Sequence, residues 1–295
     1  MKISDLDRQF KYYALYEKGI KAKTYRSVVS TLKMLSAFAK SENLNDLTSD
    51  IIKTFLYYGR VEKGWKAKTF RNHWQYLKIF FDWCVKNRFF RRNPVVGIEK
   101  PKLEKYLPRS ISTPDAQKVL FHTMWYPWHY ELEKVRNEAI IAALMTTGLR
   151  LQELLNLEIK DVNFENSEIT VNQGKGRKDR IVPIHFSLLP ILKRYFQNRR
   201  EAGRPSRWFF TGVRSDKQLA QKDIRVICGK ISTSSGVKFT PHMLRHTFAR
   251  EMIDKDFNLY KLKEIMGHAD IRTTQRYLSI SMQGIKKSFE QVKLF

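Results

Sequence analysis

The stretch PHMLRHTFAR brings two histidines and an arginine within five positions of one another. Thr240 before it is a favoured N-cap, and the proline that follows is tolerated at the first helical position, so a helix is expected to begin there. Offsets of three and four place His242, Arg245 and His246 on one face of that helix. Because the apolar residues fall on a second face, the polar face is expected to point away from the core. Those apolar residues are Leu244, Phe248 and Met252.

Three kinds of site would use such a polar face. A metal site would take histidines at i and i+4, but Arg245, which keeps its proton, would repel a divalent cation. Histidines hydrogen-bonded to the backbone near a helix start are a second, purely structural interpretation. A phosphate clamp is the third, because a guanidinium offers a planar fork of donors and a histidine adds a donor or a proton. The choice between the last two depends on the rest of the chain.

Another arginine stands at the start of a second predicted helix, in TTGLRLQEL. Thr147 and Gly148 end one helix and Arg150 opens the next, at an end where anions are favoured. Glu153, one turn later, can orient Arg150 or cap the helix. Arg150 is therefore a candidate phosphate ligand, although an arginine at a helix start is common by itself.

Two further motifs carry groups suited to the same chemistry. The turn GKGRKDR holds Lys175 between glycines, which let the backbone turn tightly and present the ammonium at a tip. In IMGHADIRTTQRYL, Gly267 ends a helix, His268 follows at once, and Tyr277 lies nine residues further on. Each motif alone is more typical of a solvated turn or of a core tyrosine than of a site.

Together the four motifs supply two guanidinium forks, a lysine, two histidines and a tyrosine, with no carboxylate cluster suited to magnesium. A phosphodiester under attack gains negative charge on its non-bridging oxygens, which two arginines can bind. A tyrosine can be the covalent nucleophile once its proton is removed, and a lysine or histidine can protonate a leaving alkoxide. The combination predicts phosphoryl transfer without a metal or a cofactor.

Composition indicates the partner. The 295 residues include 55 Lys and Arg against 29 Asp and Glu, a formal net charge of +26, which favours a polyanion. Nucleic acid is favoured over a membrane surface, because the charge is spread along the chain and no apolar run approaches the ~20 residues of a spanning helix. The N-terminus does not resemble a signal peptide, and the two cysteines, Cys84 and Cys228, suggest neither a disulfide nor a zinc site. A cytoplasmic protein is expected.

The elements that must position these residues fall into two domains. Residues 1–92 are expected to form a four-helix DNA-binding domain, and 110–295 a mixed domain that carries all four motifs. Residues 93–109 are interpreted as a linker, since the surrounding stretch is rich in basic residues and prolines that prevent a continuous helix. The helices of the first domain are predicted at 4–19, 24–42, 48–64 and 68–87, with Ser4, Thr24 and Thr48 as N-caps.

The second domain is predicted to be mostly helical with a small sheet. Its strands are expected in EITV and RIVPI, which flank the glycine-rich turn as a hairpin, and in RWFFTG. Helical spacing covers most of the remainder, and the last fifty residues are predicted to form four short helices. Residues 285–295 carry an apolar stripe that must be buried somewhere, on this domain or on a neighbour.

In order and in spacing, the motif residues resemble those of the tyrosine recombinases, the lambda-integrase family. The resemblance covers the whole chain and implies a mainly α fold with a small β-sheet. A helical, SAM-like core-binding domain and a mixed α+β catalytic domain would form a C-shaped clamp on duplex DNA. The matching residues are Arg150 in TGLRLQEL, Lys175 in GKGRKDRIVPI, His242 and Arg245 in PHMLRHTFA, His268 in LKEIMGHADIRTTQRY, and Tyr277.

The resemblance also implies a role for each residue. Arg150 and Arg245 would clamp the non-bridging oxygens, and His268 would add a third hydrogen bond. His242 would be the general acid or base near the tyrosine, and Lys175 the acid for the 5′-oxygen. No metal or ATP is implied, because the bond energy would be stored in a covalent protein–DNA link.

Tyr277 would attack the scissile phosphate, forming a 3′-phosphotyrosine and freeing a 5′-hydroxyl. Strands would then be exchanged in two pairs through a Holliday junction, within a homo-tetramer on two DNA sites. The C-terminal tail would be exchanged between subunits, with an accessory protein as a possible activator, in association with the nucleoid. His246 is interpreted as a structural partner in the helix of His242.

Three alternatives share this fold or this chemistry. Type IB topoisomerases and telomere resolvases use the same reaction without exchanging partners, and a DNA-binding protein could keep the fold without the chemistry. The compact size favours a simple recombinase of the Xer kind or a small mobile-element integrase. The sequence does not choose between those two.

Overall fold

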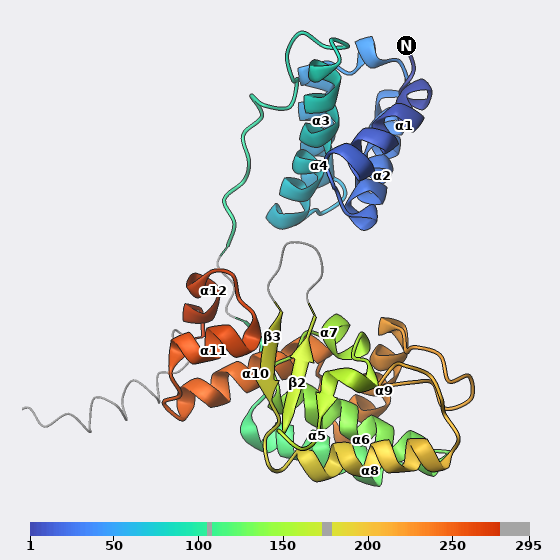
Figure 1. Ribbon diagram of the computed structural model, residues 1–295. Helices are drawn as coiled ribbons and strands as arrows, with labels where there is room; N and C mark the ends of the chain where they lie inside the picture. Colours follow the sequence, from blue (N-terminus) through green and yellow to red (C-terminus); the bar gives the residue numbers. More distant parts are fainter. Residues whose placement is uncertain (105–107, 173–178, 278–295) are drawn as a thin grey trace, which may run out of the picture. The chain divides into compact units, whose positions relative to one another are not determined.

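The computed structural model describes residues 1–104, 108–172 and 179–277. The chain divides into two compact units, Met1–Lys105 and Tyr106–Phe295, each with its own hydrophobic core (Figure 1). Mainly helical structure with one small sheet was expected from the sequence, and it is confirmed.

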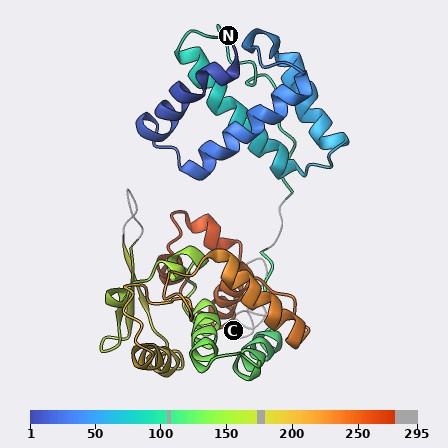
Figure 2. The ribbon, with the colours of Figure 1, turned by 90° about the vertical axis from the view of Figure 1, so that its right-hand side faces the viewer.

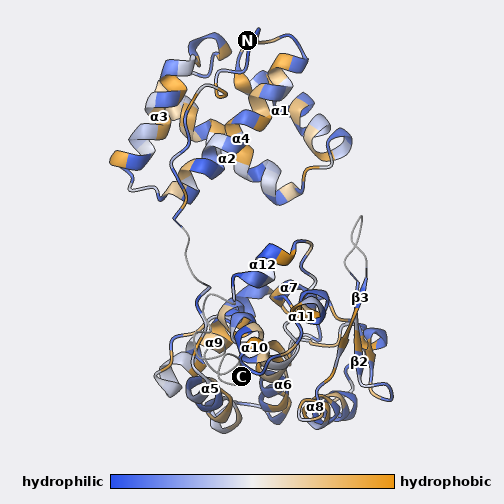
Figure 3. Ribbon diagram, turned by 90° about the vertical axis from the view of Figure 1, so that its left-hand side faces the viewer, coloured by the Kyte–Doolittle hydropathy of each residue, from blue (hydrophilic) through white to orange (hydrophobic). Residues whose placement is uncertain are grey.

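Four amphipathic α-helices form the first unit. Helix α4 lies at its centre, packing against α2 and α3 and burying a row of aromatic residues. Hydrophobic and polar residues alternate along these ribbons, as amphipathic helices require (Figure 3). The elements are α1 (Ile3–Tyr12), a π-helical turn (Tyr13–Glu17), α2 (Ala22–Ala39), a 3-10 turn (Leu44–Asp46), α3 (Ser49–Val61) and α4 (Ala67–Lys86).

One of the three predicted N-caps of this unit is confirmed. The Thr48 hydroxyl accepts the Ile51 N–H at the start of α3. Ser4 and Thr24 lie inside their helices, so these two assignments are wrong. Helix α1 starts before Ser4 because the Asp5 carboxylate accepts the Lys2 N–H at 2.9 Å. Helix α2 begins at an alanine, the best helix former, two residues before Thr24.

The first core continues past residue 92, into the stretch interpreted as a linker. Val95 and Ile98 are buried among the helices of this unit. The indole N–H of Trp74 donates to the Ile98 carbonyl at 3.1 Å, and the Ser49 hydroxyl donates to the Pro94 carbonyl at 2.8 Å. Apolar residues between the prolines therefore anchor the chain to the helices before it leaves this unit.

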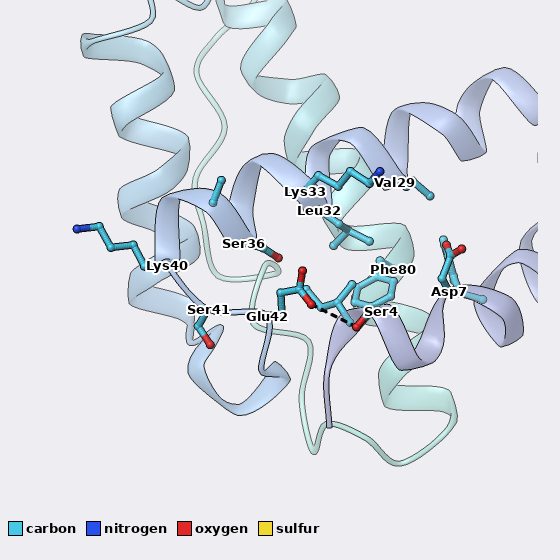
Figure 4. Close-up of a pocket in the computed structure, with 13 residues that line it drawn as sticks. Ser4, Asp7, Val29, Leu32, Lys33, Ser36, Lys40, Ser41, Glu42 and Phe80 are labelled. Atoms are coloured by element: carbon cyan, nitrogen blue, oxygen red, sulfur yellow. Dashed lines mark hydrogen bonds between the residues drawn. The ribbon is translucent and has the colours of Figure 1, made fainter.

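A cavity of about 610 Å³ lies beside α1 and α2 (Figure 4). Apolar residues such as Leu32 and Phe80 line it, together with polar side chains such as Asp7 and Lys33. The Ser4 hydroxyl donates to the Glu42 carboxylate at 3.2 Å across one end. No histidine, arginine, tyrosine or cysteine lines this cavity, so it does not offer the chemistry predicted for the second unit.

The second unit is built around α6, which is buried along most of its length and packs against α5, α8 and α10. Seen from the side, the β-hairpin and α5 lie on opposite sides of this unit, with α6 between them (Figure 2). Its helices are α5 (Thr113–Trp125), α6 (Glu131–Thr146), α7 (Leu151–Leu155), α8 (Leu189–Glu201), α9 (Gln221–Ser235), α10 (Pro241–Asp254), α11 (Leu259–Met266) and α12 (Ile271–Gln275).

The sheet has three antiparallel strands in the order β1-β2-β3: β1 (Val162–Asn163), β2 (Glu168–Val171) and β3 (Arg180–Pro183). The predicted hairpin is confirmed, with Val171 opposite Arg180 at the start of the turn. RWFFTG does not join the sheet as a strand. Its aromatic residues Phe209 and Phe210 are buried in the core, and its backbone forms isolated β-bridges to Glu158 and Gln218.

Candidate active site

Helix α10 carries three of the candidate side chains. It begins as predicted: the Thr240 hydroxyl accepts the Met243 N–H, and Leu244 and Phe248 are buried. The expectation that the whole polar face points away from the core is wrong, because Arg245 is only 3% exposed. A buried guanidinium requires hydrogen-bond partners, and the surrounding loops supply three.

The Arg245 guanidinium joins two loops that are far apart in sequence. It donates to the Gly148 carbonyl, to the Met266 carbonyl at 2.8 Å and to the His268 ring at 2.9 Å. Burial and the nearby Arg150 lower the pKa of Arg245 to about 10, so the group stays cationic at neutral pH. Helix α10 thus holds the α6–α7 loop and the α11–α12 loop against one positive charge.

Gly148 makes this convergence possible. Its φ of +63° is a left-handed conformation that L side chains rarely adopt, and a Cβ there would lie 2.6 Å from the ring of Phe248. The helix end predicted at Thr147 and Gly148 is confirmed, since Thr147 is the C-cap of α6. The glycine turn brings Arg150, two residues later, to the start of α7.

Glu153 organises the arginines of the site. Its carboxylate accepts the Arg150 backbone N–H at 2.8 Å and the Arg150 guanidinium at 2.6 Å, so it both caps α7 and orients Arg150, as predicted. It also accepts two bonds from Arg180, and Arg245 lies 3.9 Å away. Burial acts to raise the pKa of Glu153, but the bonds from Arg180 and Arg150 outweigh it and hold the pKa at about 2.

Arg180 is a member of the cluster that sequence reasoning missed. It lies on β3 and donates to the Ile265 carbonyl at 2.8 Å as well as to Glu153. Strand periodicity contained the signal, because Arg180 and the buried Val182 project from the same face of β3. An arginine on the inward face of a strand needs an acidic partner, and Glu153 is that partner.

His268 follows the C-cap of α11 and contacts two side chains. Its Nε2 lies 2.9 Å from the Arg245 guanidinium and its Nδ1 lies 2.8 Å from the Thr274 hydroxyl. Arginine can only donate, so Nε2 accepts and Nδ1–H donates to Thr274. Burial, together with Arg245 and Arg150, lowers the pKa of His268 to about 4, so the ring is neutral at neutral pH.

Tyr277 lies just after α12 and is only 2% exposed. Its hydroxyl is 2.6 Å from His246 Nδ1, and the His246 ring in turn contacts the His242 ring at a centroid distance of 4.2 Å. Burial raises the pKa of Tyr277. Burial also lowers the pKa of His246, to about 4, with the nearby His242 and Arg245 acting in the same direction.

These contacts change one sequence-based assignment. His242 was expected beside the tyrosine and His246 was expected only to support the helix, yet His246 makes the hydrogen bond to the phenol. The pKa of His242 is lowered by burial and by the charges of Arg245 and Arg150. The two histidines share one face of α10, as predicted, and helical spacing alone could not say which ring meets the phenol.

The structure therefore brings five of the six predicted residues into one cluster. The sixth, Lys175, lies outside the described residues, as does the C-terminal tail. Among the described residues, no group of three or more His, Cys, Asp or Glu side chains could hold a metal ion. In the same part of the chain, no helix is long and apolar enough to cross a membrane. The clustered residues are Arg150, His242, Arg245, His268 and Tyr277.

Comparison with known proteins identifies the family. Residues 113–283 match the phage integrase family, and residues 8–90 match the N-terminal SAM-like domain of phage integrases. The chain belongs to the phage integrase family. The predicted membership of the lambda-integrase family of tyrosine recombinases, a family of DNA breaking-rejoining enzymes, is confirmed. The predicted fold class, with a SAM-like domain and a catalytic domain, is confirmed as well.

Xer proteins are among the relatives within this phage integrase family. The chain is 33% identical to tyrosine recombinase XerA from Pyrococcus furiosus over 197 residues, which cover 67% of this chain and 66% of that protein. The matched region thus spans about two thirds of the length of this relative. The fold of this chain is similar to that of XerH recombinase bound to a palindromic difH substrate. The TM-score is 0.74 at 21% identity, over 97% of this chain and 84% of the XerH chain.

A transposon integrase has a similar fold. The Tn1549 transposon integrase, in complex with a circular intermediate DNA, matches with a TM-score of 0.75 at 19% identity, over 97% of this chain and 99% of that one. A similarity at this identity shows the fold alone.

Proposed function

We propose that this chain is a site-specific DNA recombinase that breaks and rejoins DNA strands through a 3′-phosphotyrosine at Tyr277. One observation carries the proposal: Arg150, Arg245, His268 and Tyr277, from segments far apart in sequence, meet in one positively charged cluster. Their types are those that metal-free phosphoryl transfer needs, and the family has the same chemistry. The relative XerA is named a tyrosine recombinase, and the structures of XerH and of the Tn1549 integrase contain DNA. Both observations support DNA as the substrate.

Arg150 and Arg245 bind the non-bridging oxygens of the scissile phosphate in this proposal. The Arg150 side chain is 34% exposed and can reach a ligand, while Glu153 and the Gly267 carbonyl fix its plane. Arg245 is fixed by loop carbonyls. Preorganised donors stabilise the charge that develops in the transition state, since no reorganisation is needed as the bond forms.

His268 adds the third hydrogen bond to the phosphate. Its Nε2 accepts from Arg245 in the free protein, so donation to a phosphate requires a proton on Nε2. The Thr274 hydroxyl permits that tautomer, because a hydroxyl can donate to Nδ1 as readily as it accepts from it. Phosphate binding to Arg245 would release Nε2 for this change.

Cleavage transfers the phosphoryl group from one oxygen to another. The Tyr277 phenol loses its proton to an imidazole and its oxygen bonds to phosphorus, while the bond from phosphorus to the 5′-oxygen breaks. Lys175 gives a proton to that leaving oxygen, and His242 serves as a general acid or base. Rejoining reverses each step with a 5′-hydroxyl of the partner strand, so neither ATP nor a metal takes part.

Strand exchange requires an assembly larger than one chain. We propose a homo-tetramer on two duplex sites that resolves strands through a Holliday junction, with the C-terminal tail docked on a neighbour and an accessory protein as a further activator. The net charge of +26 supports duplex DNA as the partner and the nucleoid as the location. Xer-type dimer resolution and mobile-element integration differ in the site that is cut, which adduct mapping identifies.

Covalent trapping tests the proposal. The protein is incubated with sheared, nicked genomic DNA from its source, denatured in detergent, and the DNA that remains attached is sequenced. We expect adducts at one or a few sites for the parental chain and none for Tyr277→Phe. Relaxation of any supercoiled plasmid without site preference would favour the topoisomerase alternative. Absence of an adduct despite DNA binding would favour a protein that has lost its chemistry.

A further inference from the structure

A hydrogen bond joins the Tyr277 phenol to His246. The phenol is buried, so its proton cannot pass directly to bulk water. His246 Nδ1 lies 2.6 Å from the hydroxyl oxygen. A base must stand within hydrogen-bond reach of the proton that it removes, and this nitrogen meets that condition before any rearrangement.

Burial and the charges around His246 keep its ring neutral. His242, Arg245 and His268 all interact electrostatically with His246, and Tyr277 faces it. Burial and the cationic surroundings disfavour the imidazolium, so the ring is neutral and carries one bare nitrogen. A neutral imidazole has two tautomers. In the one that carries its proton on Nε2, the phenol donates to the bare Nδ1, and the O–H bond points along the path of proton transfer.

His242 occupies a different place. Its ring contacts the His246 ring, and the described hydrogen bond of the phenol runs to His246. The two rings meet at 67°. Among the described contacts, it is therefore His246 that meets the reacting oxygen.

We propose that His246 is a catalytic residue that removes the proton from the Tyr277 phenol during cleavage and returns it during rejoining. The inference rests on the proposed function. In the forward step the phenolic O–H bond breaks, an N–H bond forms on His246, the phenol oxygen bonds to phosphorus, and the bond to the 5′-oxygen breaks. In the reverse step a 5′-oxygen bonds to phosphorus, the bond from phosphorus to the phenol oxygen breaks, and the imidazolium returns the proton to the phenolate.

Phosphate binding would switch this base on. In the free protein the guanidinium of Arg245 opposes a positive charge on His246. A phosphodiester anion held by Arg245 and Arg150 offsets that repulsion and moves the basicity of His246 towards its ordinary value. The nucleophile would thus be activated only when a phosphate lies in front of it, which protects the buried phenol from reacting in the absence of DNA.

Single-turnover cleavage of a nicked duplex tests the role. The duplex carries the site mapped by adduct trapping with the parental chain, and adduct formation is followed against pH. His246→Asn is the main variant, because an Asn amide occupies the position of imidazole Nδ1 and keeps a hydrogen bond but cannot accept a proton. His246→Gln is the second variant in case the first does not fold, and His185→Gln, at an exposed histidine, is the matched control.

We expect His246→Asn to bind the duplex as the parental chain does and to form the adduct on the order of a hundredfold more slowly, as for loss of a general base. Its rate should keep rising with pH where the parental rate has levelled off, because solvent must then remove the proton. A rate close to the parental one, or a slow rate with the parental pH profile, would overturn the inference. Absence of an adduct from the parental chain would instead reject the proposed function.

Discussion

Helix α4 in the first unit and helix α10 in the second each bury one side against their unit, yet different interactions hold them in place. Helix α4 is anchored by apolar side chains such as Phe80 and Leu77, which are entirely enclosed by other helices. Helix α10 buries Arg245 as well as Leu244, and the guanidinium is held by loop carbonyls and by His268. The first arrangement provides stability alone, whereas the second also holds charge where a phosphate can use it.

Truncating one residue of each helix gives the largest contrast. Leu77→Ala should lower the free energy of unfolding by about 2–5 kcal/mol, because it leaves a cavity, while bound protein cleaves DNA at the parental rate. Arg245→Ala should lower cleavage on the order of a hundredfold or more, because a transition-state donor is lost. Denaturant unfolding and single-turnover cleavage measure the two effects. Equal cleavage losses for both variants would remove the distinction.

Acid should affect the arginine cluster before it affects the apolar core. Glu153 has its pKa lowered to about 2, so its ionised form stabilises the fold above the ordinary value of 4.5, and this contribution is lost as pH falls from about 4.5 towards 2. Glu153→Gln should therefore be less stable at neutral pH by on the order of 3 kcal/mol, with the difference shrinking to little near pH ~2.

Unfolding of both proteins across that pH range measures the effect. Glu165→Gln, at an exposed carboxylate, is the control and should change little at any pH. A deficit of Glu153→Gln that stays constant with pH would show that the carboxylate charge does not stabilise the cluster.

The smallest expected effect concerns a side chain that touches no substrate. Thr274 is fully buried and its hydroxyl meets His268 Nδ1. Thr274→Val keeps the shape and removes the hydrogen bond, so cleavage should fall about five- to tenfold, as for a loss near 1 kcal/mol. Thr274→Ser should restore most of the rate. Cleavage by Thr274→Val at the parental rate would mean that the orientation of His268 does not depend on this contact.

The sequence was sufficient for the features that local rules govern. The Thr240 cap, the glycine ends of α6 and α11, the hairpin and the bond from Glu153 to Arg150 all depend on residues a few positions apart. Chain order and spacing were also enough to recognise the family.

Contacts between distant segments could not be predicted in the same way. The burial of Arg245 requires the Met266 carbonyl to lie beside α10, and the partnership of Arg180 with Glu153 requires β3 to lie beside α7. The choice between His242 and His246 as the partner of Tyr277 depends on the position of α12, which no local rule fixes. The missed interactions are therefore those that tertiary packing alone creates.

Mass spectrometry of the trapped adduct tests the central claim most directly. After nuclease digestion, trypsin should release a peptide that starts at Tyr277, since Arg276 precedes it. The proposed mechanism predicts a nucleotide attached through its 3′-phosphate to Tyr277 of the parental chain, and no such peptide from Tyr277→Phe. A nucleotide attached to any other residue, or an adduct that persists in Tyr277→Phe, would contradict it.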